Sequence, residues 1–176
     1  MRLRKRFSVI AAVISAGLLS FIAAPSVGAA VAAPSAGPPA LPAGYTTETV
    51  YIMNETATWC LDGTLAKVTM QPCSSSTDLH QEWIRYIYPG YDVYMNDYNY
   101  DCLDGTEADV SVQPCNITDA HQRWIRITYT SGNMLAIYYI ENVANEWVLD
   151  NRPTVILKPW PADIDYQLWV YSEVGT

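Results

Sequence analysis

Two stretches of this chain carry matching sets of polar side chains. The related phrases are CLDGTLAKVTMQPC at residues 60–73 with HQEW at 80–83, and CLDGTEADVSVQPC at 102–115 with HQRW at 121–124. Each set offers an aspartate, two glutamines and a histidine, which are hydrogen-bonding groups suited to holding a polar ligand. A general base acts from one position, so the duplicated His80 and His121 favour a repeated binding or structural role. The sequence therefore predicts a protein that is not an enzyme.

These sets belong to longer internal repeats, which must position them. A third triplet, YQLW at 166–169, follows HQEW and HQRW, and Asn54, Asn96 and Asn142 precede the three copies at one fixed offset. Internal repeats such as these are a stronger indication of the architecture than any single residue. The expected strands are short, rich in Val, Ile, Tyr and Thr, and broken by Gly, Pro, Asn and Asp. They span residues 49–53, 67–71, 82–88, 92–95, 110–113, 123–129, 135–140 and 154–157. No window keeps a helical period, so the predicted class is all-β.

Three Q-x-W triplets combined with two C-L-D-G motifs resemble the ricin B-type lectins, in their short-repeat bacterial form. The resemblance covers residues 45–176 and implies a β-trefoil of three four-stranded repeats, at about 45–88, 89–131 and 132–176. In such a fold a six-stranded barrel is capped by hairpins.

The trefoil places the tryptophans of the Q-x-W triplets in its core. We expect Trp83, Trp124 and Trp169 to be buried close together, and Trp59 and Trp147 to be more exposed. Arg85 and Arg126 follow two residues after the first two of these tryptophans, where strand alternation calls for an apolar side chain. Either a β-bulge or a position at the barrel end would explain them.

Four cysteines in one exported domain indicate two disulfides rather than metal ligands. The family resemblance implies pairing within each repeat, Cys60 with Cys73 and Cys102 with Cys115. In the third repeat Val148 and Trp160 take the cysteine positions. We interpret that pair as apolar volume in place of a crosslink.

The resemblance also implies a shallow sugar pocket in each repeat. In the family the aspartate of C-L-D accepts hydrogen bonds from two sugar hydroxyls, an aromatic side chain stacks on the sugar, and the residues around Q-x-W complete the contacts. The predicted carbohydrate-binding residues are Asp62, Gln71, His80, Gln81, Asp104, Gln113, His121 and Gln122. The third set, Asp150, Lys158, Tyr166 and Gln167, departs from the pattern, and we expect it not to bind.

The stacking aromatic is missing from these sets. Gln71 and Gln113 occupy its position, and the nearby tyrosines Tyr98 and Tyr100 are candidates for a relocated platform. Without stacking, a single site reaches about millimolar affinity, near −4 kcal/mol, although two weak sites can act together. An alternative reading is that Asp62, Asp104 and Asp150 only cap turns.

The N-terminal residues read as an export signal. Residues 1–30 combine a basic start, an apolar run and small residues, which is typical of a cleaved signal peptide, and residues 31–44 form a Pro/Ala-rich linker. The expected location is therefore secreted and extracellular, with no membrane association after cleavage. The formal net charge is −8, and four of the ten Lys and Arg residues lie in the signal peptide. A chain this acidic is a poor partner for nucleic acid.

The combined prediction is a secreted, monomeric, carbohydrate-binding trefoil with no cofactor and no metal. Galactose- or xylose-type glycans are the ligands that the resemblance favours. The segment DYNYDCLDG at 97–105 begins like a calcium loop, but Cys102 and Ala108 replace the glycine and glutamate that such a loop needs. The alternative function is a protein-binding trefoil, such as a protease inhibitor, whose sugar sites have degenerated.

Overall fold

The structure, a computed structural model, describes residues 41–174 apart from 57, 65, 75–77, 107, 130–136 and 162–165. The predicted signal peptide and residues 31–40 of the predicted linker lie outside the described residues. No helix in the described part of the chain has the length and apolarity needed to cross a bilayer.

The described residues form twelve strands, four in each repeat, and one short 3₁₀ helix. We call the repeats units 1, 2 and 3. Unit 1 contains β1 (Thr46–Asn54), β2 (Trp59–Asp62), β3 (Thr69–Pro72) and β4 (Glu82–Tyr88). Unit 2 contains β5 (Tyr91–Asn96), β6 (Asp101–Asp104), β7 (Ser111–Pro114), η1 (Ala120–Gln122) and β8 (Trp124–Tyr129). Unit 3 contains β9 (Ile137–Asn142), β10 (Trp147–Asp150), β11 (Ile156–Pro159) and β12 (Trp169–Glu173).

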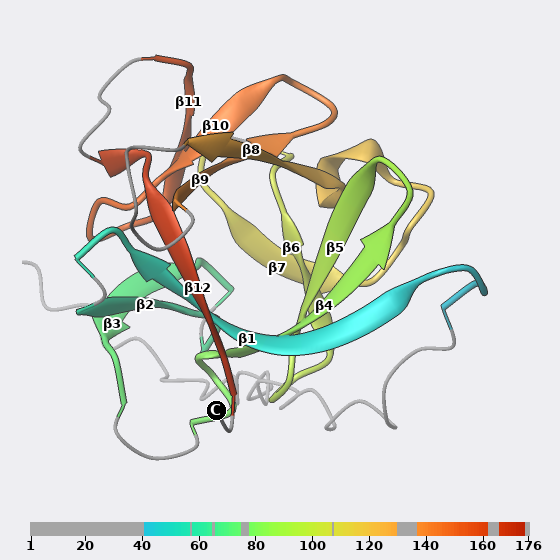
Figure 1. Cartoon of the computed structure of the whole chain (residues 1–176), viewed down its shortest axis with the longest axis horizontal. Helices are drawn as coiled ribbons and strands as arrows, with labels where there is room; N and C mark the ends of the chain where they lie inside the picture. Colours follow the sequence, from blue (N-terminus) through green and yellow to red (C-terminus); the bar gives the residue numbers. More distant parts are fainter. Residues whose placement is uncertain are drawn as a thin grey trace, which may run out of the picture. The chain divides into compact units, whose positions relative to one another are not determined.

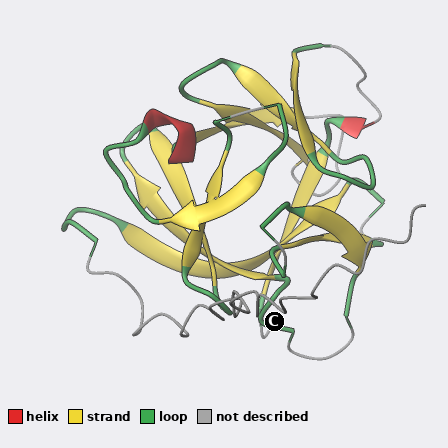
Figure 2. Cartoon of the chain, turned by 180° about the vertical axis from the view of Figure 1, so that it is seen from behind, coloured by secondary structure: helices red, strands yellow, loops and turns green. Residues whose placement is uncertain are grey.

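Six of these strands close a barrel. Antiparallel pairing runs from β1 to β4, β5, β8, β9 and β12, and β12 pairs with β1 again, so the ring has no free edge. Figure 1 shows β12 lying along β1 where the ring closes, and Figure 2 shows the same strands from behind. The predicted all-β trefoil is confirmed.

The other six strands form three hairpins, β2–β3, β6–β7 and β10–β11. A cyclic set of backbone hydrogen bonds joins them. The N–H of Val68 donates to the carbonyl of Val110 (3.0 Å), that of Val110 to Val155 (3.3 Å), and that of Val155 to Val68 (3.2 Å). All three valines are fully buried, so each unit depends on the next for both backbone bonding and core packing.

The three Q-x-W tryptophans form the centre of the core, as predicted. Trp83, Trp124 and Trp169 are fully buried in one apolar cluster. Each indole N–H donates to the carbonyl of the leucine in the C-L-D or V-L-D strand of its own unit, at 3.0, 3.1 and 3.1 Å. A buried indole needs such a partner, and the bond explains why the two motifs recur together. Trp59 and Trp147 are exposed, which was also predicted.

Arg85 does not mark a β-bulge, because its strand keeps a continuous register with both neighbours. Its side chain is buried against carboxylates instead. Nε and Nη2 of Arg85 donate to the two oxygens of Asp92 at 2.9 and 3.0 Å, and Nη1 pairs with Glu48. Nε of Arg126 donates to the same Asp92 at 3.0 Å. Burial of Arg85 is tolerated because its guanidinium is paired, and the partly exposed Arg126 shares the same carboxylate.

Both predicted disulfides are present, Cys60–Cys73 and Cys102–Cys115. The interpretation of the third unit needs correction. Val148 is fully buried and packs with Tyr139 and Leu168, but Trp160 is 57% exposed. Only Val148 therefore fills the place of the crosslink. Trp160 instead meets Tyr139 edge-on, with ring centroids 5.8 Å apart.

Candidate functional site

Two open pockets occupy equivalent places in units 1 and 2. The pocket of unit 1 has a volume of about 510 Å³ and that of unit 2 about 640 Å³. Unit 1 contributes Asp62, Thr64, Thr69, Gln71, Pro72, Ser74, Asp78 and Gln81 to its own pocket. The second pocket is lined by the counterparts Asp104, Thr106, Ser111, Gln113, Pro114, Asn116, Asp119 and Gln122, with Ala66, Lys67 and Asp109 at its side. Because eight positions repeat, the pockets are versions of one design.

The aspartate of each C-L-D strand lies at the back of its pocket. Asp62 ends β2 and Asp104 ends β6, and both are more than nine-tenths buried. Oδ1 of Asp62 accepts the backbone N–H of Thr64 at 2.9 Å, and Oδ1 of Asp104 accepts that of Thr106 at 2.8 Å. The aspartates therefore do cap turns. Since a carboxylate has about four acceptor sites, the turn does not exhaust their capacity to bind a ligand.

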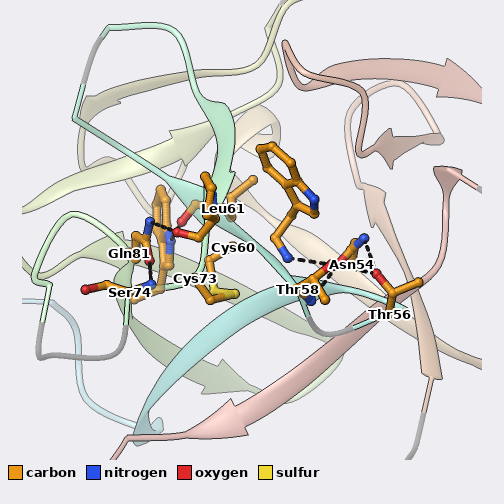
Figure 3. The surroundings of a disulfide bond; sticks show 11 residues. Asn54, Thr56, Thr58, Cys60, Leu61, Cys73, Ser74 and Gln81 are labelled. Atoms are coloured by element: carbon orange, nitrogen blue, oxygen red, sulfur yellow. Dashed lines mark hydrogen bonds between the residues drawn. A yellow bond between two sulfur atoms is a disulfide. The ribbon is translucent and has the colours of Figure 1, made fainter.

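The buried glutamines fix the segment after the second cysteine. Oε1 of Gln81 accepts the N–H of Ser74 at 2.8 Å, and its Nε2 donates to the carbonyl of Pro72 at 3.1 Å. Figure 3 shows Gln81 and Ser74 beside the Cys60–Cys73 disulfide. Gln122 repeats both contacts with Asn116 and Pro114, and its Nε2 also donates to Oδ2 of Asp104 at 3.1 Å. These amides stiffen the pocket wall rather than project from it.

Gln71 and Gln113 stand at the exposed rim. Their Nε2 groups lie 3.3 Å from the hydroxyls of Thr69 and Ser111 in the same strand. No described residue that lines either pocket is aromatic. The gap that the sequence indicated at the stacking position is therefore present in the structure.

The histidines lie outside the lining of both pockets. The carbonyls of His80 and His121 accept the N–H groups of Gly63 and Gly105 at 2.9 and 3.0 Å. The imidazole of His80 packs on Tyr98, with ring centroids 3.8 Å apart. The structure thus brings three of the four predicted residues onto the lining of each pocket. His121 is not on the lining, but its Nδ1 lies 3.0 Å from Oδ1 of Asp119, a lining residue.

Asp78 and Asp119 line the two pockets, although they are not among the residues predicted from the sequence. Oδ1 of Asp78 accepts the N–H of His80 at 3.1 Å, and Oδ1 of Asp119, the N-cap of η1, accepts that of His121 at 2.9 Å. The backbone hydrogen bond from His121 is the main factor that lowers the pKa of Asp119. The sequence carried a signal for these residues, because the triplets extend to DLHQEW and DAHQRW.

The equivalent region of unit 3 is built differently. Asp150 is fully buried, and its carboxylate pairs with Arg152 at 3.1 Å and lies 3.8 Å from Nζ of Lys158. The guanidinium of Arg152 also lies over the ring of Tyr166, 5.2 Å from its centroid. Gln167 is fully buried like its counterparts. In unit 3 the aspartate is therefore neutralised by Arg152 and Lys158, whereas its counterparts in units 1 and 2 line open pockets.

Nothing in the described residues is arranged as a metal centre: they contain no group of three or more His, Cys, Asp or Glu side chains placed to hold an ion.

Comparison with known proteins identifies the fold. No protein-family model matches the chain, and no curated protein matches it in sequence. Solved structures do match. The BEL β-trefoil is 16% identical, with a TM-score of 0.60 over 77% of this chain and 98% of that one. SeviL bound to asialo-GM1 saccharide is 13% identical, with a TM-score of 0.58 over 73% and 99% of the two chains. The GlcNAcα1-4Gal releasing endo-β-galactosidase from Clostridium perfringens is 12% identical, with a TM-score of 0.62 over 72% of this chain and 32% of its own. At these identities the likeness establishes the fold alone: the described residues form a β-trefoil.

Proposed function

We propose that this protein is a secreted trefoil of the ricin B type that binds glycans through the pockets of units 1 and 2 and catalyses no reaction. The observation that carries the proposal is the repetition of one polar pocket around Asp62 and Asp104. Asp150 provides the contrast, since Arg152 and Lys158 occupy its carboxylate. A purely structural aspartate has no need of an open pocket in two units out of three.

The lining suits a polyhydroxylated ligand. Each pocket offers carboxylate oxygens as acceptors and threonine or serine hydroxyls and a glutamine amide as donors. The aspartates are held in place by their turn amides, so little ordering is needed when a sugar binds. Hydrogen bonds to sugars replace hydrogen bonds to water, and each therefore contributes only about 1 kcal/mol.

Weak sites of this kind become effective in pairs. Without a stacking ring, one pocket is expected to bind near millimolar, about −4 kcal/mol. A glycan surface that engages both pockets gains from the effective concentration of the second site. SeviL, a trefoil of the same fold solved with a saccharide, supports this reading at the level of the fold.

The test is a glycan array with the purified protein, followed by titration of each hit against three variants. Asp62→Asn and Asp104→Asn keep an oxygen for the turn amide while they remove the charge. Each single variant should retain the other pocket and lose the gain from two-site binding. The double variant should lose binding, with a thermal midpoint within a few degrees of the parent.

Two results would contradict the proposal. If the array gives no hit at any density, the pockets are not glycan sites. If the double variant binds as the parent does, the contacts lie elsewhere on the trefoil, and a protein-binding role through its loops becomes the better account.

A further inference from the structure

The two pockets are acidic as well as polar. Unit 1 places Asp62 and Asp78 on the lining of one pocket, and no Lys or Arg of the described residues lines it. Unit 2 repeats the pair as Asp104 and Asp119, but Lys67 and Asp109 stand at its side as an ion pair. Because that ion pair is neutral, the two pockets carry the same formal charge. In unit 2, however, Nε2 of Gln122 donates to Asp104, and Nδ1 of His121 lies 3.0 Å from Oδ1 of Asp119. Among the described residues, the carboxylates of unit 1 therefore have fewer side-chain partners.

One carboxylate oxygen of Asp62 remains available to accept a hydrogen bond in this pocket. Its side chain is only 7% exposed, and Oδ1 is taken by the N–H of Thr64. Oδ2 accepts no hydrogen bond from any residue that the structure describes, whereas the equivalent oxygen of Asp104 accepts Nε2 of Gln122. Asp62 lines the open pocket, so this oxygen can accept a hydrogen bond from water or from a ligand.

Asp78 is positioned to act with Asp62. It comes from the loop before β4, not from the C-L-D hairpin, and its Oδ1 is fixed by the N–H of His80 at 3.1 Å. Both carboxylates are thus oriented by backbone amides. Carboxylates are acceptors only, so a group with several donors and a positive charge complements them best.

We propose that the unit 1 pocket selects a protonated amino sugar, such as a glucosamine residue, whose ammonium group lies between Asp62 and Asp78. This inference rests on the proposed glycan-binding function and names its ligand class. The ammonium supplies three donors and a charge, and so replaces the attraction that a stacked aromatic would give. The acidity of the whole chain, with a formal net charge of −8, adds long-range attraction for a polymer of such sugars.

Three β1,4-linked trisaccharides provide a matched series of probes. They are the trimers of glucosamine, N-acetylglucosamine and glucose, which differ only in the ammonium, acetamido or hydroxyl group at C2. Titration calorimetry at neutral pH and low salt should show about tenfold tighter binding of the glucosamine trimer than of the other two. Because the advantage is electrostatic, it should shrink as salt is raised.

Substitutions locate the effect. Asp78→Asn keeps the acceptor for the N–H of His80 and should reduce the glucosamine preference to about onefold, so that all three trimers bind equally. Asp62→Asn should have the same effect. Asp104→Asn should change the preference less, because Oδ2 of Asp104 already accepts a hydrogen bond from Gln122. Glu55→Gln removes an exposed acid outside both pockets and should leave the preference unchanged.

The outcomes separate the two proposals. Equal affinity for all three trimers, with hits on the glycan array, overturns the charge inference and leaves glycan binding standing. A glucosamine preference that survives both Asp62→Asn and Asp78→Asn also overturns it, since binding is then a general effect of the acidic surface. Absence of any glycan hit removes the proposed function itself.

Discussion

The glycine of C-L-D-G is explained by space rather than by backbone conformation. A Cβ at Gly63 would lie 2.9 Å from Nδ2 of Asn96, and one at Gly105 would lie 2.8 Å from Nδ2 of Asn142. These asparagines are fully buried and donate to the carbonyls of His80 and His121 at 2.8 and 2.7 Å. Because glycine has no side chain, it leaves room for the buried asparagine of the following unit.

The third unit shows what happens without this glycine. Asn151 occupies the position, and the matching asparagine, Asn54, turns to its own loop. Oδ1 of Asn54 accepts the N–H groups of Thr58 and Trp59 at 3.2 and 3.1 Å, and its Nδ2 donates to Thr56, as Figure 3 shows. Where asparagine replaces the glycine, the asparagine of the neighbouring unit therefore bonds within its own loop.

Gly105→Ala should lower the free energy of unfolding by about 1–3 kcal/mol, because the new Cβ overlaps Asn142 and Leu157 in a packed site. Urea denaturation measures the change. In the double variant with Asn142→Ala the cost should be less than additive, since one clash is relieved. A Gly105→Ala protein as stable as the parent would show that the asparagine is free to move.

Gln71→Trp should strengthen glycan binding about tenfold, because one stacking contact is worth roughly 1–2 kcal/mol. Gln71 lies exposed at the pocket rim, where an indole could cover the apolar face of a sugar. The same titration on Leu79→Trp, an exposed position that does not line the pocket, is the control. A gain shared by both variants would indicate non-specific adhesion.

At the scale of elements, β4, β5 and β8 are joined by a buried ionic network. Asp92 on β5 accepts hydrogen bonds from Arg85 on β4 and Arg126 on β8, and the hydroxyl of Tyr94 lies 3.3 Å from its Oδ2. Removing one member of such a network leaves buried charge uncompensated. The network therefore fixes how these three strands meet.

Asp92→Ala should lower the free energy of unfolding by about 3–5 kcal/mol, because it removes the carboxylate that pairs with the buried guanidinium of Arg85. Asp109→Ala is the matched control, since it breaks the exposed pair with Lys67 and should cost less than about 1 kcal/mol. Urea denaturation of the two variants gives the comparison. Equal losses would mean that water or Glu48 compensates Arg85.

Sequence reasoning recovered the elements whose pattern is regular. All eight expected strands overlap observed ones, and the Q-x-W tryptophans and cysteine pairs were identified because they repeat. The C-L-D strands and β12 were missed, because they are short and β2, β6 and β10 each end in an acid. Their β-structure comes from pairing with a neighbour, which no local pattern reveals.

The candidate site was predicted in part for a similar reason. Asp62 and Gln81 lie on segments whose direction the motif fixes. His80 is not on the pocket lining, and its ring packs on Tyr98 of the next unit, a contact that the motif does not reveal. The Arg85–Asp92 pair joins two strands, and alternation within one strand could not foresee it.

The whole barrel is rich in buried tyrosine, and this sets how it responds to alkali. Burial is the main cause that raises the pKa of Tyr94 and Tyr171, whose hydroxyls lie 2.7 Å apart. Burial likewise raises the pKa of Tyr51, Tyr86 and Tyr88. The folded state thus keeps protons that the unfolded chain releases at ordinary tyrosine pKa values, near about 10.

Stability should therefore be complete below about pH 10 and fall as the pH rises from there toward the raised pKa values of the folded state. The unfolded state gains free energy from ionising its tyrosines, whereas the folded state cannot ionise Tyr94 or Tyr171 without placing charge in the core. Urea denaturation at a series of alkaline pH values, with phenolate absorbance recorded in parallel, measures both effects. Tyr171→Phe should reduce the slope of stability against pH, although it loses the hydrogen bond to Tyr94 at every pH. A stability that stays level to about pH 12, with phenolate absorbance appearing in the folded protein, would show that these hydroxyls reach solvent.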